Sequence, residues 1–118
     1  MKLIELAYFT EHVEPMIDFY RDLLGLEAVA RSDEMAIFMN GDVKIFIHRT
    51  YQPTEGDLPP ENHTAFAVED VDATCEALAK RGLKIEVPPK DYYWGRSAYL
   101  RNPDGALIEI IRADELTG

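Results

Sequence analysis

A carboxylate stands in the middle of an apolar segment near the end of the chain. The segment reads Ala106-Leu107-Ile108-Glu109-Ile110-Ile111, and Glu109 is its only charged residue. Because an unpaired carboxylate buried in such a strand costs free energy, a partner for it is expected. Glu109 is therefore the first candidate for a residue with a catalytic or ligand-binding duty.

A second group of chemically versatile side chains precedes the seventh predicted strand. It consists of Tyr92, Tyr93, Trp94 and Arg96, gathered around Gly95. Aromatic rings stack on planar ligands and arginine binds carboxylates or hydroxyls, so these residues are predicted to contact a substrate. The alternative is that they cap the core or pack at a dimer contact. Phe9 is likewise predicted to line the wall of a ligand site, and the alternative is that it packs in the ordinary core.

Other classes of site have no motif in this sequence. A Ser-His-Asp or Cys-His nucleophilic arrangement, a phosphate-binding glycine loop and a zinc-type cysteine set are all absent.

The formal charge of −10, from 22 acidic against 12 basic residues, disfavours binding to nucleic acid or to an anionic membrane surface. No stretch approaches the roughly 20 apolar residues that cross a bilayer. With no signal-peptide pattern at the start, the sequence predicts a cytoplasmic protein without a membrane partner.

The elements that must position these residues occur as the same pattern twice. In residues 1–50 a strand is predicted at Leu3–Phe9, then a helix that Gly25 ends, then strands at Glu27–Arg31, Met35–Met39 and Val43–Arg49. Residues 51–62 contain three prolines and form a linker. In residues 63–113 the pattern restarts with a strand at His63–Val68, a helix capped by Asp70 and ended by Gly82, and strands at Lys84–Val87, Ser97–Arg101 and Ala106–Arg112.

The two halves superpose at an offset of 58 residues. This offset aligns Glu5 with His63 and keeps the hydrophobic phase of the first strand of each half. The repeat also sets Ile45 opposite Glu109. We therefore predict a single α+β domain over 1–118, in which two βαβββ modules form a curved eight-stranded mixed sheet with a concave ligand cleft.

Four segments make the chain similar to a known family. They are Ile17-Asp18-Phe19-Tyr20-Arg21-Asp22-Leu23-Leu24-Gly25-Leu26, Val68-Glu69-Asp70-Val71, Trp94-Gly95-Arg96 and Asn102-Pro103-Asp104-Gly105-Ala106-Leu107-Ile108-Glu109. Along its whole length the chain resembles the vicinal oxygen chelate superfamily, which holds glyoxalases, bleomycin-resistance proteins, fosfomycin-resistance enzymes and extradiol dioxygenases. That fold hosts several chemistries, so the resemblance implies the architecture more strongly than the reaction.

The resemblance implies a metal site. Its metal-dependent members take ligands from the first and last strands of each half, which here are Glu5, His63 and Glu109, with Ile45 in place of a fourth donor. One imidazole and two carboxylates suit a divalent ion such as Mn(II), Fe(II), Ni(II), Zn(II) or Mg(II), which acts as a Lewis acid. Two alternatives stay open: Glu5 can simply be solvated, and His63 can be a surface histidine bonded to a neighbouring residue of the linker.

The remaining histidines are assigned structural roles. His48 has the opposite phase to Ile45 on its strand, so it is expected to point away from the side of Glu109. His12, at the start of the first helix, is expected at the surface.

Two functions from different classes follow. The first is a metal-dependent lyase, isomerase or dioxygenase acting on a small oxygen-rich substrate that is chelated through adjacent oxygens. The second is a metal-free protein that binds and sequesters a small molecule, in the manner of resistance proteins. The resemblance also implies a homodimer.

Overall fold

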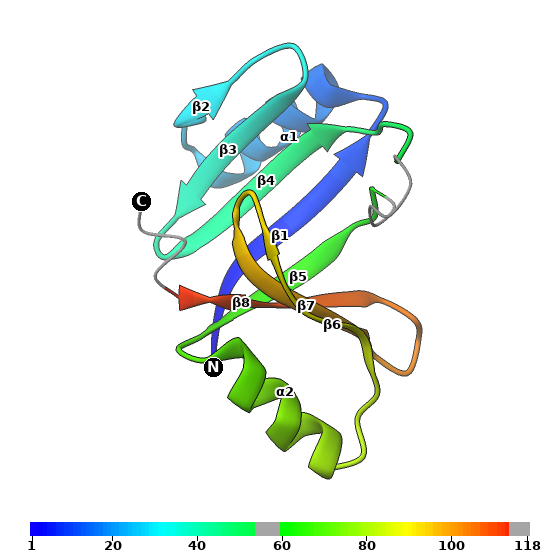
Figure 1. The fold of residues 1–118 in the computed structure, drawn as a ribbon. Coiled ribbons are helices and arrows are strands. Elements are labelled where there is room, and N and C mark those ends of the chain that lie inside the picture. The colour runs from blue at the N-terminus through cyan, green and yellow to red at the C-terminus, as the bar shows by residue number, and fades with distance from the viewer. Residues whose placement is uncertain (54–59, 114–118) are drawn as a thin grey trace. The chain divides into compact units, whose positions relative to one another are not determined.

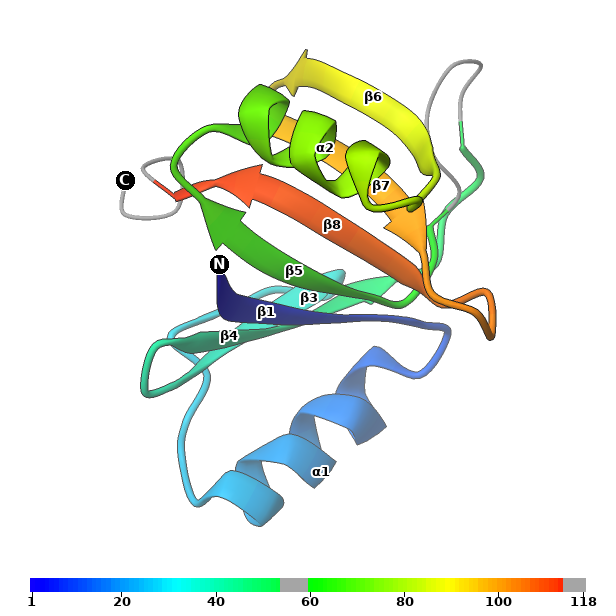
Figure 2. The same cartoon turned by 90° about the horizontal axis from the view of Figure 1, so that it is seen from below.

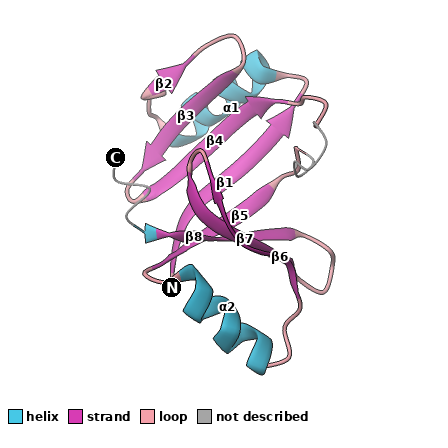
Figure 3. Cartoon of the chain, in the orientation of Figure 1, coloured by secondary structure: helices cyan, strands magenta, loops and turns pink. Residues whose placement is uncertain are grey.

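The part of the chain described by the computed structural model, residues 1–53 and 60–113, divides into two units. The N-terminal unit is Glu5–Asn62, and the C-terminal unit joins Met1–Ile4 to His63–Gly118. Each unit contains a helix and a set of strands (Figures 1 and 3). The predicted linker 51–62 and the end of the predicted domain 1–118 lie partly outside the described residues.

The N-terminal unit has the order strand, helix and three strands. Its elements are β1 (Lys2–Thr10), which belongs to this unit from Glu5 onward, α1 (Val13–Leu24), β2 (Ala30–Arg31), β3 (Met35–Asn40) and β4 (Val43–Arg49). The strands lie in the order β2-β3-β4-β1, with β1 parallel to β4 and the other pairs antiparallel. The predicted stop of α1 is confirmed, because Gly25 takes a left-handed φ of 68° that glycine adopts without strain.

Helix α1 lies against one face of the strands of this unit (Figure 2), and the core lies between them. Val13 and Ile17 of α1 pack with alternate residues of β3 and β4, which are Ala36, Phe38, Ile45 and Ile47. Because side chains alternate across a strand, the residues between these point to the opposite face of the sheet. That second face therefore carries Phe46 and His48 of β4.

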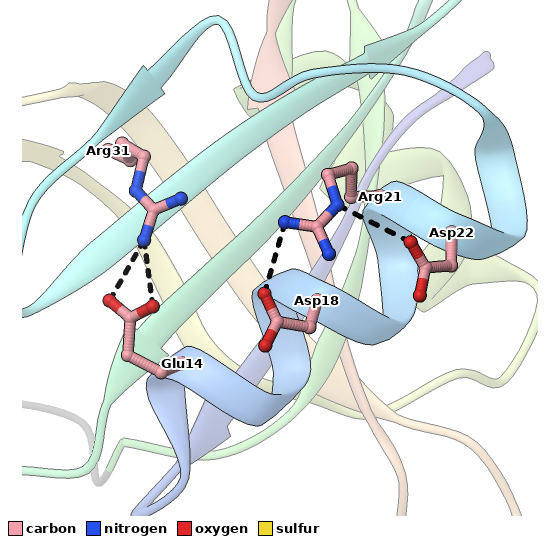
Figure 4. Close-up of polar contacts among 5 residues, drawn as sticks. All are labelled: Glu14, Asp18, Arg21, Asp22 and Arg31. Carbon is pink, nitrogen blue, oxygen red and sulfur yellow. Dashed lines mark hydrogen bonds and ion pairs between the residues drawn. The ribbon is translucent and has the colours of Figure 1, made fainter.

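Charged residues of α1 form ion pairs on the outer surface of the helix (Figure 4). Arg31 donates from one nitrogen to both carboxylate oxygens of Glu14, at 2.9 and 2.8 Å. Arg21 lies 3.2 Å from Asp18 and 3.4 Å from Asp22.

The strand predicted at Glu27–Arg31 is wrong at its start, since only Ala30–Arg31 pair with β3.

The C-terminal unit repeats the order of elements. They are β5 (His63–Val68), α2 (Val71–Lys80), β6 (Ile85–Tyr92), β7 (Gly95–Arg101) and β8 (Leu107–Arg112), with the strands in the order β5-β8-β7-β6. Helix α2 covers β6, β7 and β8 (Figure 2). Its core consists of Val71, Cys75, Ala98, Leu100 and Ile110. The Asp70 carboxylate caps α2 as predicted, accepting from the Ala73 N–H at 2.9 Å.

Strand β6 is the main correction to the predicted elements. The sequence predicts a strand over Lys84–Val87, yet β6 continues through Pro88 and Pro89 to Tyr92. Its pairing with β7 shifts register between Ile85 and Val87 and again between Val87 and Lys90. Bulges and an edge position accommodate residues that cannot donate to the ladder, and β6 is the outermost strand of its unit.

The predicted α+β class is confirmed, and the described residues form two βαβββ modules with eight strands in mixed parallel and antiparallel pairing. The equivalence of Ile45 and Glu109 is wrong. Ala7 pairs with Phe46 and Ala65 pairs with Glu109, so Phe46 is the true counterpart of Glu109 in the N-terminal unit.

Over residues 1–53 and 60–113, neither helix has the length and hydropathy that a membrane span requires.

Candidate functional site

Glu109 lies on the face of its sheet that points away from α2. Its neighbours Ile108 and Ile110 pack into the core beneath α2, so the side chain between them points to the other face. On the adjacent strand, Tyr99 pairs with Glu109 in register. His63 opens β5, on the other side of β8. Three strands of the C-terminal unit thus bring polar side chains to one face.

One carboxylate oxygen of Glu109 accepts three hydrogen bonds. Ser97 Oγ donates to Oε2 at 2.7 Å, and Tyr99 OH and Trp94 Nε1 donate to the same oxygen at 3.2 Å each. Trp94 Nε1 is also 3.2 Å from Ser97 Oγ. The carboxylate is buried, with the residue 4% exposed, and Ser97 is fully buried. The cost of burying this charge is offset by the donors around it.

The other oxygen of Glu109 faces His63. Nε2 of the imidazole lies 3.3 Å from Oε1, and both side chains are largely buried. The ring of His63 also packs edge to face with Tyr99, at a centroid distance of 6.4 Å. The alternative of a surface histidine is therefore not what the structure shows.

The electrostatics of this pair favour the ionised carboxylate. Burial by itself raises the pKa of Glu109. Hydrogen bonds from His63, Ser97 and Tyr99 lower that pKa, and so does the charge of His63. The net result is a pKa below the ordinary carboxyl value. Glu109 is therefore ionised at neutral pH, which is the form that binds a cation.

The arrangement fits a metal ion. Two ligands that each lie about 2.1 Å from an octahedral ion and at right angles to each other are roughly 3.0 Å apart. The separation of 3.3 Å between Nε2 and Oε1 is close to that spacing. Hydrogen bonds that hold a ligating carboxylate are the usual support of such a ligand.

The third predicted ligand, Glu5, begins the N-terminal unit. It pairs in register with Lys44 of β4, and the Lys44 ammonium lies 3.8 Å from Glu5 Oε1. Glu5 thus has a cationic neighbour of its own, so the alternative of a merely solvated side chain does not describe it. By the internal repeat, its counterpart is His63.

The predicted substrate-binding residues of the C-terminal unit separate into different environments. The segment is a hairpin tip, since Tyr92 pairs with Gly95 and only Tyr93 and Trp94 form the turn. Tyr93 is 98% exposed, whereas Trp94 stacks on Tyr92 with a centroid distance of 4.4 Å.

Arg96 is engaged away from Glu109. Its guanidinium donates to both carboxylate oxygens of Asp72, at 2.7 and 2.9 Å, and to Asp91 at 2.9 Å. These acidic partners raise the pKa of Arg96 above its usual value. Because Asp72 lies on α2, the guanidinium is held on the helix side of the sheet.

Phe9 belongs to an aromatic cluster in the N-terminal unit. Its ring lies 6.5 Å from Phe46, 6.0 Å from His48 and 6.0 Å from Tyr51. His48 Nδ1 donates to the Arg49 carbonyl at 2.7 Å. His48 has the opposite phase to Ile45 on its strand, as expected. The side predicted from that phase is wrong, because His48 shares a sheet face with Phe46, which is the position equivalent to Glu109. The error follows from the one-residue error in the register of β4.

Sequence reasoning missed Ser97 and Tyr99. Their signal was present in the segment Ser97-Ala98-Tyr99-Leu100, where hydroxyl-bearing and apolar residues alternate. Alternation places both hydroxyls on one face, and antiparallel pairing with β8 places Tyr99 beside Glu109. The register between the two strands was the missing information.

Comparison with known proteins gives one family. Residues 2–110 match the model of the Glyoxalase/Bleomycin resistance protein/Dioxygenase superfamily. The chain is 32% identical to the uncharacterized protein YraH of Bacillus subtilis (strain 168), over 95% of this chain and 98% of that protein. It is 30% identical to a manganese-dependent 2,3-dihydroxybiphenyl 1,2-dioxygenase of Geobacillus genomosp. 3, covering 92% of this chain but only 36% of the dioxygenase.

A solved structure shows the same fold. The crystal structure of a hypothetical protein from Bacillus halodurans C-125 aligns with a TM-score of 0.71 at 18% identity. The alignment covers 94% of this chain and 93% of the other. At this identity the likeness concerns the architecture alone.

Proposed function

Because the chain belongs to the Glyoxalase/Bleomycin resistance protein/Dioxygenase superfamily, we propose that it is a metal-dependent lyase, isomerase or dioxygenase. Its substrate would be a small oxygen-rich molecule that binds through adjacent oxygens. The observation that carries this proposal is the buried pair of His63 Nε2 and Glu109 Oε1, 3.3 Å apart. A buried carboxylate held as an anion beside an imidazole is the donor chemistry of a divalent metal site.

The proposed ligands are Glu109, His63 and Glu5. The sequence repeat supports the inclusion of Glu5, since it occupies the position in the first module that His63 occupies in the second. Nitrogen and oxygen donors of this kind suit Mn(II), Fe(II), Ni(II), Zn(II) or Mg(II). The manganese dependence in the name of the Geobacillus dioxygenase supports including manganese among the ions tested.

When bound, the ion would supply a Lewis acid that stabilises negative charge on the substrate oxygens. The chain's own contribution is to hold that ion. The donors on Glu109 Oε2 keep the carboxylate ionised and fix its orientation, so little reorganisation is needed on binding. Glu109 is also the residue that we propose for the catalytic role, because it is the buried anion at this site.

Elemental analysis of tag-free protein after dialysis tests the proposal. Wild type is expected to retain a divalent metal in near-stoichiometric amount or to take it up when Mn(II), Fe(II), Ni(II) or Zn(II) is added. Glu109→Gln keeps the shape of the side chain and removes the charge, so it should lose the metal. Glu76→Gln is the matched control, because Glu76 is an exposed carboxylate on α2 of the same unit.

The competing function is metal-free binding of a small molecule. It is favoured by the aromatic cluster of Phe9, Phe46, His48 and Tyr51, and by an apolar residue, Phe46, at the position equivalent to Glu109. This function requires that no metal is retained or taken up, and that aromatic ligands bind equally well in EDTA. Metal uptake that Glu109→Gln abolishes would argue against it.

We also propose a homodimer in the cytoplasm, on the family resemblance and the composition. Light scattering at micromolar concentration tests the assembly, and a monomeric mass would refute it.

A further inference from the structure

We propose that Trp94 is a positioning residue for Glu109. Its indole N–H would set the direction of the Ser97 hydroxyl and hold Glu109 Oε2, so that Oε1 is the oxygen left to the metal beside His63. This inference rests on the proposed function, because the ion is the one proposed there. It assigns to the hairpin tip a duty other than substrate contact.

The directions of the hydrogen bonds follow from the donors available. An indole nitrogen can only donate, so Ser97 Oγ must accept from Trp94 at 3.2 Å. The single hydroxyl proton of Ser97 is then directed to Glu109 Oε2 at 2.7 Å. An ionised carboxylate only accepts, so the Tyr99 hydroxyl donates to the same oxygen at 3.2 Å. Trp94 thus acts on the carboxylate directly and through Ser97.

The consequence is an asymmetric carboxylate. Oε2 has the three donors, and a carboxylate oxygen offers only about two lone pairs in its plane. Coordination of a metal through both oxygens would have to displace one of these donors. Coordination through Oε1 alone leaves all three in place, and Oε1 is the oxygen that faces His63 Nε2.

The hairpin holds Trp94 in the orientation that this duty needs. The Trp94 ring stacks on Tyr92 at 4.4 Å with an interplanar angle of 6°, and Tyr93 meets it edge on at 4.8 Å. Gly95 follows with a φ of 136°, a conformation that side chains other than glycine rarely adopt. Although Trp94 is 36% exposed, its polar edge is turned toward the buried pair of Ser97 and Glu109. The stacked ring therefore limits the motion of the N–H donor.

The test measures zinc affinity in wild type, Trp94→Phe and Tyr93→Phe by calorimetry. Trp94→Phe keeps an aromatic ring against Tyr92 but lacks the N–H donor, so its affinity is expected to fall by about 10- to 100-fold, as is typical for outer-shell partners of a ligand. Tyr93→Phe is the matched control on the same turn, where the hydroxyl is exposed, and should bind as wild type. Unfolding of the metal-free proteins in EDTA measures the purely structural effect separately.

Two further readouts separate positioning from general stability. Trp94 is the only tryptophan of the chain, so zinc binding is expected to shift the intrinsic fluorescence of wild type and of Tyr93→Phe. Ser97→Ala removes the relay hydroxyl, and its loss of affinity should not add to that of Trp94→Phe, because both changes break one network. Ser97→Ala also tests the relay if Trp94→Phe does not fold.

The outcomes distinguish this inference from the proposed function. Zinc binding in Trp94→Phe as tight as in wild type would overturn the positioning role and leave the metal site standing. Additive losses of affinity from Trp94→Phe and Ser97→Ala would do the same. Wild type that binds no metal under any condition would overturn both. A weakened Trp94→Phe beside an unchanged Tyr93→Phe supports the assignment.

Discussion

Substitution of Ser97 by alanine is the sharpest probe of the network around Glu109. Ser97 is fully buried and its hydroxyl lies 2.7 Å from an anionic oxygen, so the bond is charge-assisted. Hydrogen bonds to charged groups contribute roughly 1.5–3 kcal/mol, and alanine leaves almost no cavity. The indole N–H of Trp94 keeps one acceptor, Glu109 Oε2. We therefore expect Ser97→Ala to lower the free energy of unfolding by about 2 kcal/mol at pH 7.

This loss should depend on pH in a defined direction. The pKa of Glu109 is lower in the folded protein than its ordinary value of 4.5. Ionised Glu109 therefore stabilises the folded protein at pH values above 4.5. The contribution is lost as pH falls below 4.5 and through the folded pKa. Once the carboxyl is neutral, the Ser97 bond is an ordinary one of about 1 kcal/mol, so the gap between wild type and Ser97→Ala narrows in acid.

Urea unfolding of metal-free protein at several pH values measures this effect. Tyr93→Phe is the control, because it removes a hydroxyl that is 98% exposed and should leave the free energy of unfolding unchanged. A gap between wild type and Ser97→Ala that stays constant from neutral to acidic pH would refute the reasoning. A loss below about 0.5 kcal/mol at neutral pH would do the same, since it is smaller than a buried charge-assisted bond supplies.

Three other outcomes are expected in the rest of the fold. Asp70→Ala should cost about 1 kcal/mol in urea unfolding, because it removes the acceptor for the Ala73 N–H at the start of α2. Burial, followed by the hydrogen bond with Tyr8, raises the pKa of Tyr20 to about 12. Its neutral form therefore adds stability below pH 10 that is lost between 10 and 12. Ultraviolet titration of Tyr8→Phe should show the Tyr20 pKa moving part of the way back toward 10. Burial likewise raises the pKa of the Cys75 thiol, so a thiol reagent should label it rapidly only after unfolding.

Much of the local structure could be predicted from the sequence because local signals agree there. The strands Val43–Arg49 and His63–Val68 have the predicted bounds, since alternation and turn residues define both ends. The prediction failed at β6, where the expected strand ends at Val87 but the observed strand continues to Tyr92. The pairing of β6 with β7 has register shifts there, and an edge strand tolerates the two prolines. Local pattern cannot show that a strand is an edge, because that depends on which strands pair.

The candidate site divides in the same way. Glu109 could be singled out from the sequence alone, because a charge in an apolar strand needs a partner wherever the strand lies. Ser97 and Tyr99 could not be assigned to it, although their alternation is visible, because the pairing of β7 with β8 sets which residues meet. Tertiary structure likewise decided that Arg96 binds Asp72 and Asp91, and that Trp94 donates to Glu109.

Residue types and periodicity therefore determined the two modules, the class of fold and the one carboxylate that requires an explanation. Only the tertiary structure decided its partners and the equivalence of Phe46 with Glu109. The physical reason is that a strand shifted by one residue turns every side chain to the opposite face. In each unit the register is selected by packing of the strands against the helix of that unit, so it cannot be predicted from any local stretch of the sequence.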